Sequence, residues 1–157
     1  MAASPVRSRL ATVGLLGLLA VPWSVQVFSG RDATLVFAWG LVNTNPPMVT
    51  TLPEFLFLYT RGLPEYILAW PLSVGAYAAA LASAAVGWQT GREDPRVTAG
   101  LLVVAAVAQA HLAWGFSVQP NRVAWPVGSA ALGAVAAVYY WMSTRRSEGG
   151  TDAGRGR

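Results

Sequence analysis

The chain has 157 residues, of which 54% are hydrophobic and only 11% are charged. Soluble domains carry roughly 25% charged residues, so the composition predicts an integral membrane protein. The sequence has no cysteine and one histidine, which excludes disulfide scaffolds, thiol chemistry and multi-histidine metal centres within one chain. Its basic residues are all arginine and stand in short clusters between long uncharged runs, which argues against a nucleic-acid partner.

Uncharged apolar runs predict an all-α membrane protein with four transmembrane helices in an antiparallel bundle. A bilayer core of about 30 Å needs roughly 20 apolar residues in a helix. Four runs reach this length, and the predicted spans cover residues 10–29, 65–88, 97–118 and 123–144 of a single domain, 10–144. Residues 1–9 precede the first span, and residues 145–157 form a polar tail that is predicted to be disordered.

The stretch between the first two spans, residues 30–64, is predicted to be an external loop. Its centre reads NTNPP (residues 43–47), and these groups would lack hydrogen-bond partners in lipid. Residues 35–42 are predicted to form a short helix or a strand. The loop is predicted either to lie at the interface or to re-enter the bilayer against protein. Thr51 and Glu54 have the spacing of a capping box, which predicts a short interfacial helix over residues 52–61.

Arginine positions predict the orientation in the membrane. With four spans and a cytoplasmic N-terminus, Arg31, Arg61 and Arg122 lie outside and the other eight arginines lie inside. This is the direction of the positive-inside rule. Both chain ends are therefore predicted to be cytoplasmic, in a multi-pass protein of the cell membrane.

Polar residues within the predicted spans are the candidate functional residues. His111, the one histidine of the sequence, lies on the third predicted span; Gln109 lies on the same span, and Gln26 lies on the first span at similar depth. Such a histidine either relays a proton or orients a ligand, or it is a structural group hydrogen-bonded across helices. The sequence holds no catalytic constellation or nucleotide-binding motif, so no enzyme activity, cofactor or metal is predicted.

Small residues recur every four positions along the second predicted span, at Gly75, Ala79, Ser83 and Gly87. Such a stripe lets helix backbones approach closely, so it predicts tight packing, self-association or contact with another membrane protein. Alanine-rich helices also produce such stripes by chance. Pro22 and Pro71 are predicted to kink the outer halves of their spans.

Three short segments, LPEFL (52–56), TRGLP (60–64) and AWP (69–71), resemble the signature of a small haloarchaeal family of four-span integral membrane proteins with no established function. The resemblance covers about the central third of the chain. It implies location and topology and transfers no catalytic residue. The sequence as a whole predicts a non-enzymatic accessory or scaffold-type helical bundle whose partner is the lipid bilayer. The alternative is an oligomeric transport or channel component with a path near His111 and the kinked outer halves.

Overall fold

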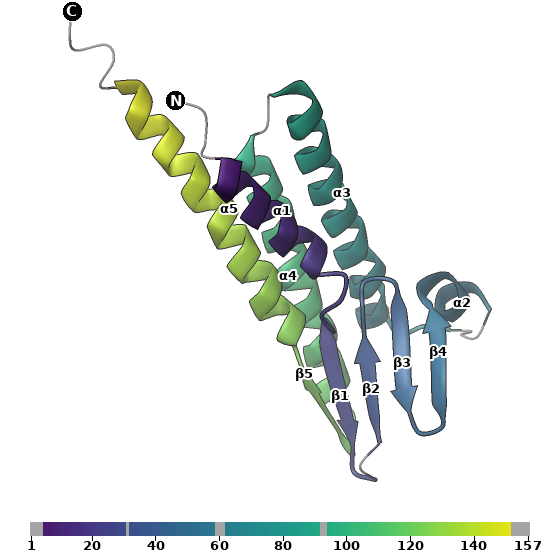
Figure 1. Ribbon diagram of the computed structural model, residues 1–157. Helices are drawn as coiled ribbons and strands as arrows, with labels where there is room; N and C mark the ends of the chain where they lie inside the picture. Colours follow the sequence, from purple (N-terminus) through teal and green to yellow (C-terminus); the bar gives the residue numbers. More distant parts are fainter. Residues whose placement is uncertain (1–4, 31, 59–61, 92–93, 152–157) are drawn as a thin grey trace, which may run out of the picture.

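The computed structural model describes residues 5–30, 32–58, 62–91 and 94–151. Figure 1 shows a sheet at one end of a group of helices, with the longer helices running away from it. The helices are α1 (Pro5–Gly17), α2 (Leu52–Phe57), the 3-10 helix η1 (Glu65–Leu68), α3 (Ala69–Thr90), α4 (Pro95–Ser117) and α5 (Val127–Thr151). The strands are β1 (Ser24–Phe28), β2 (Ala33–Val36), β3 (Gly40–Thr44), β4 (Pro47–Thr51) and β5 (Arg122–Trp125).

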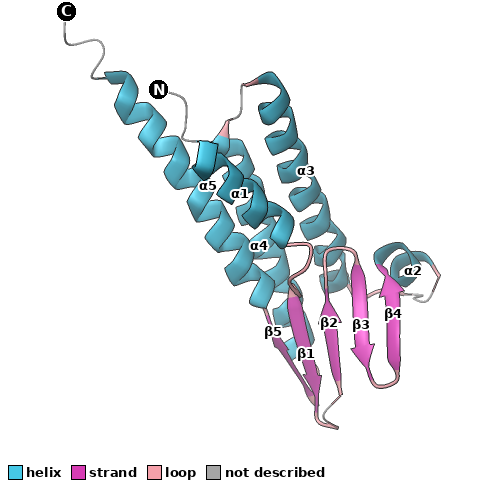
Figure 2. Ribbon diagram, in the orientation of Figure 1, coloured by secondary structure: helices cyan, strands magenta, loops and turns pink. Residues whose placement is uncertain are grey.

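The five strands form one antiparallel sheet in the order β4-β3-β2-β1-β5 (Figure 2). The first four follow one another along the chain as hairpins. The fifth comes from the connection between α4 and α5 and pairs with β1, so that Val25 lies opposite Trp125. The sheet therefore joins the first and last parts of the chain.

The predicted all-α bundle of four transmembrane helices is wrong, because part of the apolar sequence forms strands. The predicted span 10–29 divides into the end of α1, a turn that contains Pro22, and β1. The 13 residues of α1 reach about 20 Å, short of a bilayer core of about 30 Å. Among the described residues, two helical segments are long and apolar enough to cross a membrane, Glu65–Thr90 and Pro95–Ser117.

The sheet also replaces the predicted external loop. Residues 33–51 contain β2, β3 and β4. Within the NTNPP segment, Asn43 and Thr44 end β3, Asn45 and Pro46 form the turn with a cis bond between them, and Pro47 begins β4. Because this segment is a hairpin turn and not a span, its polar groups do not have to find partners within an apolar layer. Pro47 begins the edge strand β4, where a missing N–H is tolerated. Thus neither an interfacial loop nor a re-entrant one describes the segment.

The boundaries of three other predicted features differ. Helix α2 ends at Phe57, before the predicted end at residue 61, and residues 59–61 lie outside the described residues. Helix α5 continues to Thr151, so residues 145–151 of the predicted disordered tail are helical, and residues 152–157 lie outside the described part. Pro71 lies in the first turn of α3, where a missing N–H costs little.

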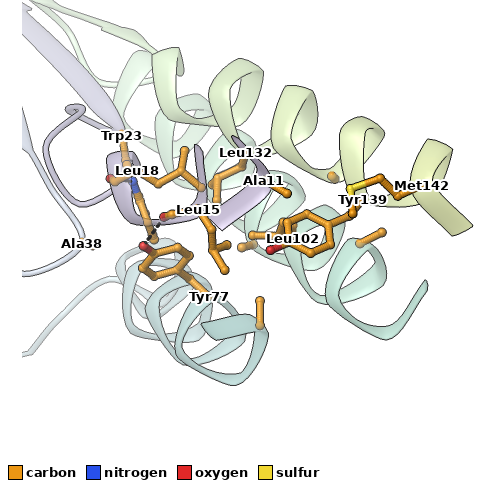
Figure 3. Close-up of a cluster of buried hydrophobic side chains, with 14 residues drawn as sticks. Ala11, Leu15, Leu18, Trp23, Ala38, Tyr77, Leu102, Leu132, Tyr139 and Met142 are labelled. Atoms are coloured by element: carbon orange, nitrogen blue, oxygen red, sulfur yellow. Dashed lines mark hydrogen bonds between the residues drawn. The ribbon is translucent and has the colours of Figure 1, made fainter. Parts of the chain in front are cut away.

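A buried cluster between the helices holds the sheet in place (Figure 3). The indole of Trp23, just before β1, donates to the carbonyl of Leu18 at 2.9 Å and meets the ring of Tyr77 edge-on at 5.2 Å. The Tyr77 hydroxyl donates to the carbonyl of Leu15 at 2.6 Å. Gly128 lies directly against Trp23, and a Cβ there would come within 2.6 Å of the Trp23 Cβ. These contacts fix the base of β1 to α1, α3 and α5.

Candidate functional site

A cavity of about 440 Å³ lies where the sheet meets the helices, and we call it the junction cavity. One face of the sheet forms one wall, and α2, η1, the start of α3 and the end of α4 form the other. Its lining consists of Gln26, Phe28, Thr34, Val36, Leu41, Asn43, Met48, Thr50, Phe55, Tyr66, Ile67, Trp70, Phe116 and Arg122. The volume is within the range of about 300–1,000 Å³ that small-molecule sites occupy.

Strand register explains the sheet wall of the cavity, because alternate residues of a strand point to the same face. Gln26 lies opposite Thr34, and Thr34 lies opposite Asn43. These three residues form a polar row across β1, β2 and β3, and the Thr34 hydroxyl donates to Asn43 Oδ1 at 2.6 Å. We call this cavity-lining side of the sheet the inner face.

The side-chain amide of Gln26 has no hydrogen-bond partner among the described residues, although the residue is only 4% exposed. Its amide lines the junction cavity and offers both a donor and an acceptor there. Gln26 therefore has hydrogen-bonding capacity available to a group that enters the cavity.

Arg122 supplies the only formal positive charge in the lining of the junction cavity. Its guanidinium carbon lies 4.6 Å from the ring centroid of Phe28 and 5.4 Å from that of Phe116, within cation–π range. No described Asp or Glu forms an ion pair with it, and none lines the cavity. The two rings therefore hold the guanidinium in place, and no carboxylate of the described residues neutralises its charge.

Aromatic rings form the wall of the cavity opposite the sheet. The ring of Phe55 lies 5.4 Å from that of Trp70, and the ring of Tyr66 meets that of Phe116 edge-on at 5.3 Å. The Trp70 indole donates to the carbonyl of Phe37 at 3.0 Å, and the Tyr66 hydroxyl accepts from the Gln119 amide. These rings come from four different elements, so the wall exists only in the folded chain.

Helix α2 carries Phe55 to this wall, and a capping box begins the helix. The Thr51 hydroxyl accepts from the Glu54 N–H at 3.5 Å, and the Glu54 carboxylate accepts from the Thr51 N–H at 2.9 Å. Hydrogen bonds from the Thr51 backbone and hydroxyl hold the pKa of Glu54 below its ordinary value. The cap predicted from the sequence is thus present, and it positions one side of the cavity.

The structure does not bring Gln26, Gln109 and His111 together. Gln26 lines the junction cavity. Gln109 is fully buried in α4, and neither of its side-chain polar atoms has a partner among the described residues. His111 is exposed on another side of α4, with its ring 6.1 Å from that of Trp114. The two residues of α4 therefore face different surroundings.

The small-residue stripe of α3 also divides into two parts. Gly75 and Ala79 are exposed, and a Cβ at Gly75 would meet nothing within 4 Å. Ser83 and Gly87 lie further along α3, where the Thr98 hydroxyl donates to the Ser83 hydroxyl at 3.1 Å and Gly87 is buried. Only the second half of the stripe therefore lies where α3 packs against α4.

Most of the residues that line the cavity are not recognisable as site residues from the sequence. Arg122 appeared as a loop charge, and Thr34 and Asn43 appeared as residues of an external loop. The available signal was the alternation of Ser24, Gln26 and Phe28 with valines, which has the period of a strand. It predicts an inner and an outer face, but it does not reveal that β5 will pair with β1.

Comparison with curated proteins gives no match for the chain. Comparison with known families gives one that spans residues 2–149, which includes every element of the sheet and every residue that lines the junction cavity. The chain therefore belongs to the family described as a domain of unknown function (DUF8050).

Proposed function

We propose that the chain is a non-enzymatic membrane protein in which α3 and α4 cross the bilayer and the sheet stands outside it. One observation carries this proposal: apart from His111 and residues near the helix ends, the exposed side chains of both helices are apolar. The large exposed residues there are Leu72, Val86 and Trp88 on α3, and Val97, Val103, Val104, Val107 and Trp114 on α4. A helix that is apolar on all sides needs a protein interior or a membrane around it.

Helix length and tryptophan placement support the same arrangement. The 22 residues of α3 and the 23 of α4 extend about 33–35 Å, enough for a bilayer core of about 30 Å. Trp88 is 84% exposed near the end of α3 away from the sheet, and Trp114 is 67% exposed near the end of α4 beside the sheet. Tryptophan is enriched at both membrane–water interfaces, and these two stand at opposite ends of the helix pair.

The proposed orientation puts the connection between α3 and α4 in the cytoplasm. The end of α3 and the start of α4 lie on the side of the molecule away from the sheet (Figure 1). The positive-inside rule then favours a cytoplasmic location for that side, because Arg92 and Arg96 stand in the sequence at this connection. The sheet and its junction cavity would face the outside, where an accessory or scaffold protein offers a binding surface. The transport alternative gains no support, because His111 and Gln109 face different surroundings.

Single cysteines can test this arrangement, since the natural chain contains none. We expect an impermeant maleimide to label Val49→Cys on intact cells, because Val49 is exposed on the sheet. Gln89→Cys, at the far end of α3, should react only after permeabilisation, and Val104→Cys, midway along α4, should stay unlabelled in both states. The cysteine-free chain is the control. Labelling of Val104→Cys as fast as Val49→Cys would overturn membrane insertion.

A further inference from the structure

We propose that the junction cavity binds an anionic amphiphile, with a carboxylate or phosphate head at Arg122 and an apolar body along the aromatic wall. This proposal goes beyond membrane insertion and does not depend on it. It rests on the lining of one cavity that has a cationic end, unpartnered donors and a largely apolar remainder. Each of these features selects a different part of the ligand.

The head is selected by an excess of hydrogen-bond donors. Arg122 has five N–H groups and no carboxylate partner among the described residues. Asn43 already accepts from Thr34 through Oδ1, which leaves its amide hydrogens to donate. A cationic head would meet Arg122 without any carboxylate in the lining to offset the repulsion, so an anion is favoured.

Gln26 lies within reach of the same head. It pairs with Ala124 in the register of β1 and β5, which makes Arg122 its diagonal neighbour on the inner face. Diagonal neighbours in an antiparallel pair stand about 7–8 Å apart, a gap that a carboxylate or phosphate can bridge from two long side chains. A bound head would therefore give the buried Gln26 amide the partner that it lacks within the chain.

The body of the ligand is selected by the rest of the lining. Phe55, Trp70 and Ile67 line the cavity together with Val36 and Leu41, and all five belong to one hydrophobic cluster. A small inorganic anion would leave this apolar space filled with water, whereas an apolar chain would remove the surface from water at about 25 cal/mol per Å². The combination therefore favours an amphiphile over a free anion, whether it comes from the bilayer or from solution.

Equilibrium binding to the full chain in phosphatidylcholine nanodiscs tests the proposal, with empty nanodiscs subtracted. The probes are myristate, myristyl alcohol and inorganic phosphate. We expect saturable binding of one myristate per chain and at least about tenfold weaker binding of the alcohol, because a hydrogen bond to a charged group contributes about 1.5–3 kcal/mol. Phosphate binding as tight as that of myristate would indicate a free-anion site and overturn the proposal.

Variants separate the head contact from partition into lipid. Arg122→Gln should remove the preference for myristate over the alcohol, and Arg122→Lys should restore part of it. Arg96→Gln, at the opposite end of α4, is the matched control and should bind like the natural chain. Thr50→Trp should fill the cavity and weaken both ligands, which keeps the test valid if Arg122→Gln does not fold. Myristate uptake that is non-saturable, or unchanged in Thr50→Trp, would overturn the proposal, as would an unchanged preference for myristate in a folded Arg122→Gln.

Discussion

The two faces of the sheet carry cross-strand rows of opposite polarity. The inner face carries the polar row Gln26, Thr34 and Asn43 beside a cavity. The outer face carries a row in the same register, made of Val25, Leu35, Val42 and Val49. One-sided antiparallel sheets ordinarily turn apolar side chains to the core and polar ones to water. The inner polar row instead stands on the side that packs against the helices and borders the junction cavity, which points to binding as its role.

The largest expected effect comes from separating the sheet from the helices, which would expose both faces. We expect Gly128→Ala to cost about 3 kcal/mol of unfolding free energy, because its Cβ would press on the backbone and Cβ of Trp23. Denaturant unfolding in a neutral detergent, followed by circular dichroism, measures this. Gly133→Ala on the same helix has open space and is the control. Equal stability of the two variants would contradict the described contact.

Matched substitutions can compare the faces directly. Val36 on the inner face is 2% exposed, whereas Val49 on the outer face is 59% exposed. We expect Val36→Thr to lose about 2 kcal/mol, since its hydroxyl would be buried, and Val49→Thr to change stability by less than about 0.5 kcal/mol. The same unfolding measurement reports both. A larger loss at Val49 would show that the outer face is covered in the purified protein.

The amides of Gln26 and Gln109 should respond differently to removal. We expect Gln109→Leu to gain about 1 kcal/mol of unfolding free energy, because it removes a buried polar group that has no partner among the described residues. Gln26→Leu should instead weaken myristate binding, since Gln26 alone of the two lines the junction cavity. A loss of stability at Gln109 would indicate that an ordered water satisfies its amide.

The smallest effect concerns the cap that holds Phe55 over the inner face. The pKa of Glu54 is lowered by hydrogen bonds from Thr51, so the stabilisation is present at neutral pH and is lost as the pH falls through the lowered value. Hydrogen exchange of the α2 amides should therefore accelerate only in acid, below the ordinary range of a glutamate. Glu54→Gln should abolish this pH dependence, and Thr51→Ala should accelerate exchange at every pH. Unchanged acid dependence in Glu54→Gln would assign it to another group.

The sequence allowed α3, α4 and the cap of α2 to be placed, but not the sheet. Long charge-free runs reveal where an apolar helix fits, and Thr51 with Glu54 forms a local signal that depends on four residues. The run that contains Val25 and Val27 has the hydropathy of a spanning helix, and this hides the alternation of side chains along β1 that is typical of a strand. Hydropathy measures how apolar a segment is and does not show which backbone hydrogen bonds it makes.

The candidate cavity was harder to predict because its parts come from distant positions. Gln26 stood out as a polar residue in an apolar run, yet its neighbour Arg122 arrives only through the pairing of β1 with β5. His111 is a candidate by its chemistry alone, and the fold leaves it exposed. Polar residues could be noticed from the sequence, but the register that groups Gln26, Thr34 and Asn43 is a tertiary property.

The pairing of β1 with β5 has a consequence for how the protein is made. During synthesis from the N-terminus, four strands emerge early, but the fifth follows only after two long helices have been translated. Until then the free edge of β1 presents unpaired backbone groups, which can recruit other strands. A ribosome that stalls within α4 would therefore release a fragment prone to aggregate, whereas one that stalls after Trp125 would release a chain that can complete its own sheet.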